Sequence, residues 1–222
     1  MTEPPAPDTP ENGTLRPAEL AAHLAARLCH DFISPASAIV SGVDLLEDPA
    51  NQDMREDAMS LIAASARKLA DLLQFCRVAF GASASAETFD ARELEKLARG
   101  IFGHMRAELD WQVEAEAVNK PTARALLNLA QLAGAALPTG GVAKVRAVQE
   151  AAQVAIAVEA AGPRARLRPE VLAGLRGEGA GEGLHGQWVQ ARYVNLFVGD
   201  AGGRVFADAA EEKVTFAATI PA

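Results

Sequence analysis

The chain has 222 residues, of which half are hydrophobic and 23% are charged, and its formal net charge is −8. This length suffices for two small domains or one large domain, and the composition is that of an ordinary globular protein. Because the net charge is negative, we expect neither a nucleic acid nor an anionic membrane surface as a partner.

The first 16 residues are rich in proline, acidic residues and threonine, which predicts a disordered tail over residues 1–16. This segment has neither the basic nor the apolar stretch of a secretory signal. No later apolar run approaches the roughly 18 residues that are needed to cross a bilayer. The two cysteines, Cys29 and Cys76, are most simply read as reduced thiols. We therefore expect a cytoplasmic protein.

A long helix is predicted over residues 17–47, because Pro17 fits the first turn of a helix and turn-forming residues follow at 49–51. His30 lies about 200° around this helix from Leu28 and therefore points away from the apolar face, toward water. The apolar side chains at helical spacing, which form a face that must be buried, are Leu24, Leu28, Phe32, Ile39, Val43 and Leu46.

His30 is followed at once by Asp31. An exposed imidazole beside a carboxylate suits reversible phosphoryl capture, in which a ring nitrogen attacks phosphorus. The carboxylate then accepts the ring proton or fixes the tautomer. The alternative is a surface histidine without a role. Pro35 removes one backbone donor inside the helix, so a bend is expected within a turn of His30.

Two side chains flank His30 on the helix surface, Arg27 at i−3 and Ser34 at i+4. Arg27 could stabilise the charge of a phosphate and Ser34 could hydrogen-bond it, or either could be plain surface. Ile33 and Ser37 lie toward the surrounding face. These four residues are the candidates for docking a partner, and no cofactor or metal site is expected in the chain itself.

A second helix is predicted over residues 52–79, and the two helices form a hairpin over 17–80 that is about 45 Å long. Its apolar face is wider than one partner can cover. We therefore predict a homodimer in which two hairpins form a four-helix bundle. The alternative is that this face packs on the C-terminal part of the same chain.

Residues 81–88 are small and polar and predict a linker. The order of elements after it predicts an α/β two-layer domain with a mixed sheet over residues 89–222, so that the whole chain is of the α+β class. The predicted helices are 89–105, 121–137, 169–175 and 188–198, and the predicted strands are 109–113, 142–148, 154–159 and a last hairpin over 204–220.

The run ARLCHDFISPASAIVSGVDLLED, residues 26–48, resembles the phosphoacceptor box H-[E/D]-x-x-[T/N]-P of sensor histidine kinases, with Ser34 in place of threonine or asparagine. From about Leu20 to the C-terminus, the chain is similar to the ChpT-type histidine phosphotransferases of alphaproteobacteria. These are phosphorelay proteins shaped like a sensor kinase core whose ATP-binding domain is degenerate. The resemblance implies that His30 is the phosphoacceptor and that Asp31 accepts or orients its proton.

The resemblance also implies that residues 89–222 form a Bergerat (GHKL) domain, whose nucleotide boxes are altered here. The family's N-L-x-x-N-A box begins at Asn128, but its second asparagine is Leu132, which cannot coordinate magnesium. The adenine box D-x-G-x-G has Ala160 in place of aspartate and Arg164 in place of the last glycine. The glycine lid G-x-G-L-G remains at 181–185, except that its last position is His185. ATP binding is therefore not expected.

These observations predict a histidine phosphotransferase that shuttles a phosphoryl group through His30 between receiver-domain aspartates. Magnesium is expected on the receiver. The resemblance implies a hybrid kinase upstream and response regulators downstream, one of them a DNA-binding cell-cycle regulator. Two alternatives remain, an ATP-dependent sensor kinase core and a non-catalytic dimeric adaptor. The sequence leaves open the identity of the receivers, the direction of transfer and the nitrogen that is phosphorylated.

Overall fold

The computed structural model describes residues 15–81, 87–179 and 186–222. Most of the predicted tail, most of the predicted linker and the run 181–185 lie outside these residues. The division of the chain into domains stays a prediction.

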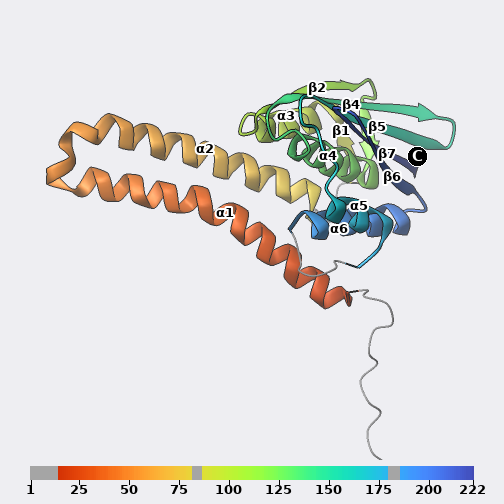
Figure 1. The fold of residues 1–222 in the computed structure, drawn as a ribbon, viewed down its shortest axis with the longest axis horizontal. Helices are drawn as coiled ribbons and strands as arrows, with labels where there is room; N and C mark the ends of the chain where they lie inside the picture. Colours follow the sequence, from red (N-terminus) through yellow and green to blue (C-terminus); the bar gives the residue numbers. More distant parts are fainter. Residues whose placement is uncertain (1–14, 82–86, 180–185) are drawn as a thin grey trace, which may run out of the picture.

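The N-terminal part is a hairpin of two long helices that projects from the rest of the molecule (Figure 1). The first, α1 (Pro17–Glu47), has the predicted bounds and bends partway along its length (Figure 1). Pro35, which removes one helical hydrogen bond, is buried inside it. The second, α2 (Arg55–Ala79), begins later than predicted because a 3-10 helix, η2 (Pro49–Met54), precedes it.

The two helices approach closely at Gly42 of α1, which is buried. A Cβ atom on this glycine would lie 2.6 Å from Cγ1 of Ile62 and 3.2 Å from the backbone oxygen of Ala58, both on α2. Ala58 is buried at the same crossing. The small residue therefore sets the spacing of the hairpin in its far half.

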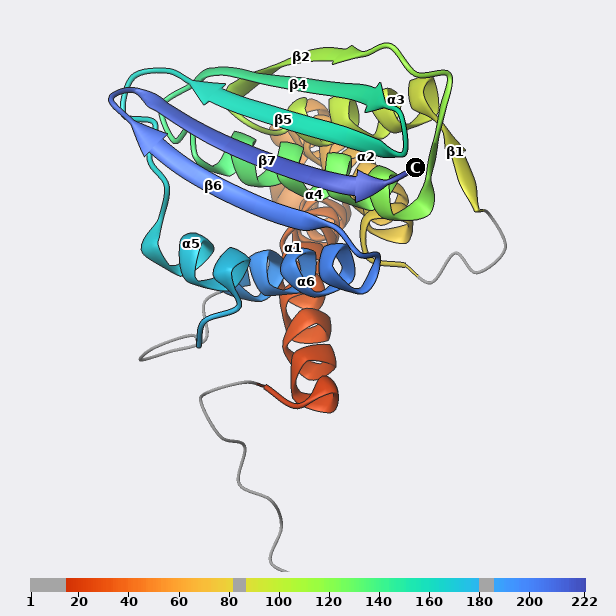
Figure 2. The ribbon, with the colours of Figure 1, turned by 90° about the vertical axis from the view of Figure 1, so that its right-hand side faces the viewer.

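In the described part of the C-terminal region, five strands form one mixed sheet in the order β2-β4-β5-β7-β6. β2 is parallel to β4, and the other neighbours are antiparallel. Alternate residues of the central strands are buried under helices, which lie on one face of the sheet (Figure 2). The bounds are β2 (Ala107–Val113), β4 (Gly141–Glu150), β5 (Gln153–Ala161), β6 (Arg204–Ala210), β7 (Lys213–Pro221), α3 (Ala91–Phe102), α4 (Lys120–Ala135), α5 (Pro169–Arg176) and α6 (Gly186–Asp200). The α+β class and the mixed sheet are as predicted.

A two-stranded ribbon precedes α3 and corrects one prediction. Phe89, predicted as the start of a helix, lies in β1 (Thr88–Asp90), which pairs with β3 (Ala117–Asn119). Helix α3 begins at Ala91, and the carboxylate of Asp90 accepts hydrogen bonds from the first-turn amides, as expected of an N-cap.

The near end of the hairpin packs on the sheet and the helices around it, which are called the sheet domain below (the described residues from 87 to 222). There α2 packs against α3 and α4, and α1 packs against α6. Phe75, Val78 and Ala79 of α2 belong to the same buried core as the sheet. The far half of the hairpin keeps exposed apolar side chains, among them Val40, Val43, Met59 and Leu61. Packing within one chain therefore covers the apolar surface of the hairpin only in part, since Ile33 and Leu73, nearer the sheet domain, are exposed as well. None of the helices in the described residues is long and apolar enough to cross a membrane.

Candidate functional site

His30 lies where α1 passes the sheet domain, and 88% of its side chain is exposed. Its position agrees with the orientation expected from the helical spacing. Two pockets meet at this residue and at Asp31. One, of about 500 Å³, opens toward α5 and α6, and the other, of about 310 Å³, opens toward α2 and α3. The imidazole is therefore open to a partner and also borders the sheet domain.

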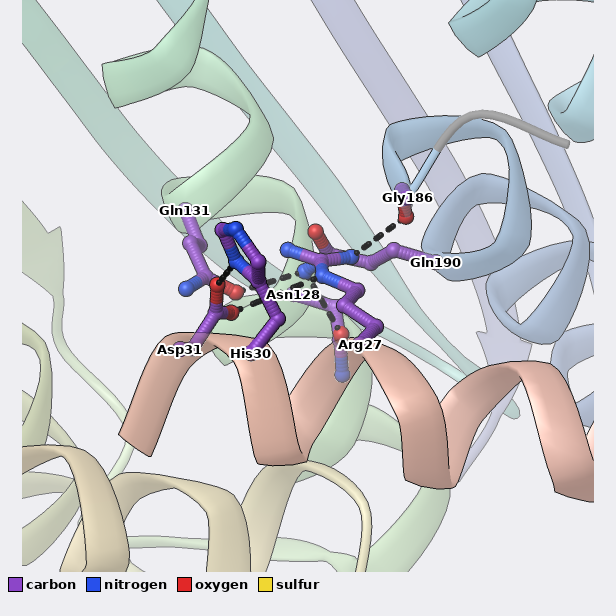
Figure 3. Close-up of polar contacts among 7 residues, drawn as sticks. All are labelled: Arg27, His30, Asp31, Asn128, Gln131, Gly186 and Gln190. Carbon is purple, nitrogen blue, oxygen red and sulfur yellow. Dashed lines mark hydrogen bonds and ion pairs between the residues drawn. The ribbon is translucent and has the colours of Figure 1, made fainter. Parts of the chain in front are cut away.

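The carboxylate of Asp31 is beside the imidazole, with Oδ1 3.4 Å from Nδ1 of His30 (Figure 3). In the tautomer that carries its proton on Nδ1, the ring donates to this oxygen, and the lone pair is on Nε2. A carboxylate in this place thus favours the form of the neutral ring whose other nitrogen is a nucleophile.

Arg27 differs from the exposed helical residue that the spacing suggests. Its side chain is only 14% exposed, because α6 covers it. Nη1 donates to the backbone oxygen of Gly186, the first residue of α6, at 3.0 Å, and Nε lies 3.7 Å from Oδ2 of Asp31 (Figure 3). Burial lowers the pKa of Arg27, and the charge of Asp31 opposes this shift. The guanidinium thus stands between α1 and α6.

The other three candidates are exposed residues of α1. Ser34 lines the smaller pocket together with His30. Ile33 is 63% exposed, and Ser37 is also exposed, but neither lines one of the two pockets at His30. The structure therefore places Arg27, Asp31 and Ser34 around His30, whereas Ile33 and Ser37 belong to the open surface beyond it.

Sequence reasoning missed the residues that complete the smaller pocket from other elements. They include Lys68 of α2, Gln131 of α4 and His104, which follows α3. Nε2 of His104 lies 2.8 Å from Oδ2 of Asp71 on α2, which ties the hairpin to the sheet domain. No local motif marks these residues, because they meet only in the folded chain.

Three positions of the first two nucleotide boxes, Asn128, Leu132 and Ala160, are buried. The amide nitrogen of Asn128 donates to the backbone oxygens of Ala79 and Arg124, at 3.0 and 2.9 Å. Its side-chain oxygen accepts from Nε2 of Gln190, which also bonds Gln131 (Figure 3). Leu132 and Ala160 are buried in the core. In the described residues, no group of three or more His, Cys, Asp and Glu side chains is placed to hold a metal ion.

Comparisons with known proteins match nearly the whole chain. Residues 91–213 match the family model of the histidine phosphotransferase C-terminal domain. The protein phosphotransferase ChpT of Brucella abortus (strain 2308) is 33% identical over 206 residues, which are 92% of this chain and 97% of ChpT. A solved bacterial phosphotransferase has a TM-score of 0.83 and 32% identity, over 92% of this chain and 98% of its own. The catalytic domain of the histidine kinase ThkA has a TM-score of 0.46 and 19% identity, over 60% of this chain and 93% of its own.

Proposed function

The chain belongs to the histidine phosphotransferase family, and from this premise we propose that His30 carries a phosphoryl group between the aspartates of two receiver domains. The observation that carries the proposal is the exposed imidazole whose Nδ1 faces the carboxylate of Asp31. It leaves Nε2 as the atom that faces an incoming partner.

The reaction follows from this geometry. Nε2 attacks the phosphorus of an aspartyl phosphate on the receiver, a nitrogen–phosphorus bond forms, and the bond from phosphorus to the aspartate oxygen breaks with its electron pair on that oxygen. The ring then carries a positive charge, and Asp31 stabilises it through the proton that stays on Nδ1. Attack by a second receiver's aspartate on the phosphohistidine reverses these steps.

Most of the catalytic groups belong to the partner in this proposal. Magnesium and its acidic ligands lie on the receiver, and this chain supplies a nucleophile, its orientation and a docking surface. We propose that receivers of a hybrid kinase and of response regulators, including a DNA-binding cell-cycle regulator, dock in the cytoplasm over the exposed face of α1. Ile33, Ser34 and Ser37 are exposed on that face.

The proposal includes the absence of ATP chemistry. Asn128, at the position of the family's first magnesium-binding asparagine, is fully buried and hydrogen-bonded through both its nitrogen and its oxygen. Leu132 and Ala160, at the positions of the second asparagine and the adenine-binding aspartate, are apolar and buried. These three side chains offer neither an oxygen ligand to magnesium nor a carboxylate to adenine.

We also propose a homodimer through the hairpin. The support is that the far half of the hairpin exposes apolar residues on both helices, Val40 and Val43 on α1 and Met59 and Leu61 on α2, which the sheet domain of the same chain leaves uncovered. A second hairpin packed on this half would bury part of this apolar surface in a four-helix bundle. Such a dimer has two His30 sites, one at the near end of each hairpin.

Phosphotransfer with purified components tests the function. The full chain is incubated with a phosphorylated receiver domain, and separately with labelled ATP and magnesium, as wild type, His30→Ala and His23→Ala. His23 lies two turns earlier on the same helix, lines the larger pocket with His30 and is not followed by a carboxylate, so it is the matched control for a second histidine at the same site. Label that comes from the receiver alone, and is lost only in His30→Ala, supports the proposal. Label taken directly from ATP would indicate a kinase, and no label by either route would indicate an adaptor.

A further inference from the structure

We propose that Arg27 is a positioning residue that ties the orientation of His30 to the placement of α6. This inference rests on the proposed function, because it assigns a role in preparing the same imidazole for phosphoryl transfer. It replaces the docking role that the sequence suggested for Arg27. The contacts form a chain from α6 to the ring, in which Gly186 meets Arg27, Arg27 meets Asp31 and Asp31 meets His30.

The first step is the carboxylate of Asp31, whose two oxygens have different partners. Oδ1 faces Nδ1 of His30 at 3.4 Å, and Oδ2 faces Nε of Arg27 at 3.7 Å. An aspartate on a helix surface otherwise samples several side-chain conformations. The guanidinium holds the carboxylate in the one that presents Oδ1 to the ring, and so favours the tautomer with its proton on Nδ1.

The second step is the guanidinium itself, which is held on its other side. Nη1 donates to the oxygen of Gly186, and the side chain is packed closely enough that a Cβ on that glycine would touch its Cδ at 3.6 Å. Arginine can make these two contacts at once because its nitrogens are fixed in a plane. The ring's orientation thus depends on a residue that is 159 positions away in the chain.

The third step separates positioning from docking. Arg27 is 14% exposed whereas His30 is 88% exposed, so a receiver that reaches the ring does not need to reach the guanidinium. Loss of Arg27 should therefore slow the transfer step and leave the affinity for the receiver unchanged. Other charged or titratable groups also line the two pockets at His30. They are His23, Arg168, Glu170, Lys68 and His104.

The test uses the full chain as wild type, Arg27→Ala, Arg27→Lys and, as control, Arg92→Ala, an exposed arginine on α3. Nitrogen-15 NMR of the neutral imidazole reports the tautomer of His30 without any phosphate. We expect the Nδ1-protonated form in the wild type and the control, and a mixture of tautomers in Arg27→Ala. Lysine restores a charge opposite Asp31, but its single nitrogen cannot also reach the backbone oxygen of Gly186. The tautomer mixture in Arg27→Lys should therefore lie between those of the wild type and Arg27→Ala.

Single-turnover transfer from a phosphorylated receiver is measured on the same variants. Arg27→Ala should be slower by about tenfold, with unchanged receiver affinity. Because Arg27 acts through Asp31, adding Arg27→Ala to an Asp31→Asn variant should cost little more. An unchanged tautomer, a weaker receiver affinity or a fully additive double variant would overturn the inference. If the wild type accepts no phosphoryl group, the proposed function fails, while the tautomer measurement still decides the role of Arg27.

Discussion

Oδ1 of Asp31 lies 3.4 Å from Nδ1 of His30, and the two residues are adjacent in the chain. Asparagine at position 31 keeps the size of the side chain but removes the charge that, in the proposed reaction, stabilises a positively charged phosphorylated ring. We expect Asp31→Asn to slow transfer to His30 by about 10²-fold, the scale of a lost acid–base partner. Single-turnover kinetics measures this, with Asp44→Asn, exposed on the same helix, as control. A rate within twofold of the wild type would contradict the role given to Asp31.

The proposed dimer depends on apolar side chains in the far half of the hairpin. Val40 is 60% exposed within one chain. Val40→Glu should place a charge inside the bundle and shift the protein from dimer to monomer in analytical ultracentrifugation. Val148→Glu is the matched control, since Val148 is 58% exposed on the sheet domain. Equal behaviour of the two variants would show that the dimer, if present, uses another surface.

Asn128 joins three parts of the fold, because it bonds the end of α2, the preceding turn of α4 and Gln190 of α6. Asn128→Ala removes these bonds and leaves the buried oxygen of Ala79 without the amide of Asn128. We expect the free energy of unfolding to fall by about 2–4 kcal/mol. Urea unfolding measures the change against Gln74→Ala, an exposed amide on α2. A loss below that of the control would mean that water satisfies these groups equally well.

Because α1 and α2 cross closely at Gly42, we expect that adding a single methyl group there lowers the stability of the folded state. Alanine is the better helix former by about 1 kcal/mol, but its Cβ would overlap Ile62. We expect Gly42→Ala to lower the unfolding temperature. Gly199→Ala, where a Cβ meets no atom within 4 Å, should leave it unchanged or raise it. If both variants are stabilised, the spacing of α1 and α2 is not limiting.

Burial raises the pKa of the Cys76 thiol from 9.0 to about 12, and the charge of Asp31 adds to this shift. A folded pKa above the unfolded one means that the native state holds its proton more tightly. The contribution of this group to stability is therefore present below pH 9 and is lost as the pH rises from 9 toward 12. Cys76→Ala should flatten the fall in unfolding free energy over that range, and Cys29→Ala, an exposed thiol, should not.

The sequence predicted the long elements well because their signals are local. Pro17 and the periodic apolar residues locate α1, and Asp90 marks the start of α3 through its capping spacing. The strands β1 and β3 were missed because three residues are too few to show alternation. The start of α2 was misplaced because the turn before it is itself helical, as a 3-10 helix.

The candidate site was only partly predictable for a related reason. Helical spacing shows which way His30 points relative to its own helix, and this was correct. Helical spacing does not show which other helix or strand packs on the faces of α1 next to His30. The burial of Arg27 under Gly186 and the approach of Lys68 and His104 depend on packing between segments far apart in the chain. A single sequence has no signal for such contacts.

Pro35 divides α1 into two segments that can bend relative to each other. The proposed site, with Arg27, His30 and Asp31, lies on the N-terminal side of the proline and contacts α6 through Arg27, whereas the exposed residues Val40 and Val43 lie on the other side. Bending at the proline would change the angle between the far half of the hairpin and the sheet domain, and the contacts around the imidazole would stay in place. In the proposed dimer, the far halves of the two hairpins would form the bundle, and each proline would be a hinge between this bundle and one His30 site. Each site could then meet a receiver independently of the other.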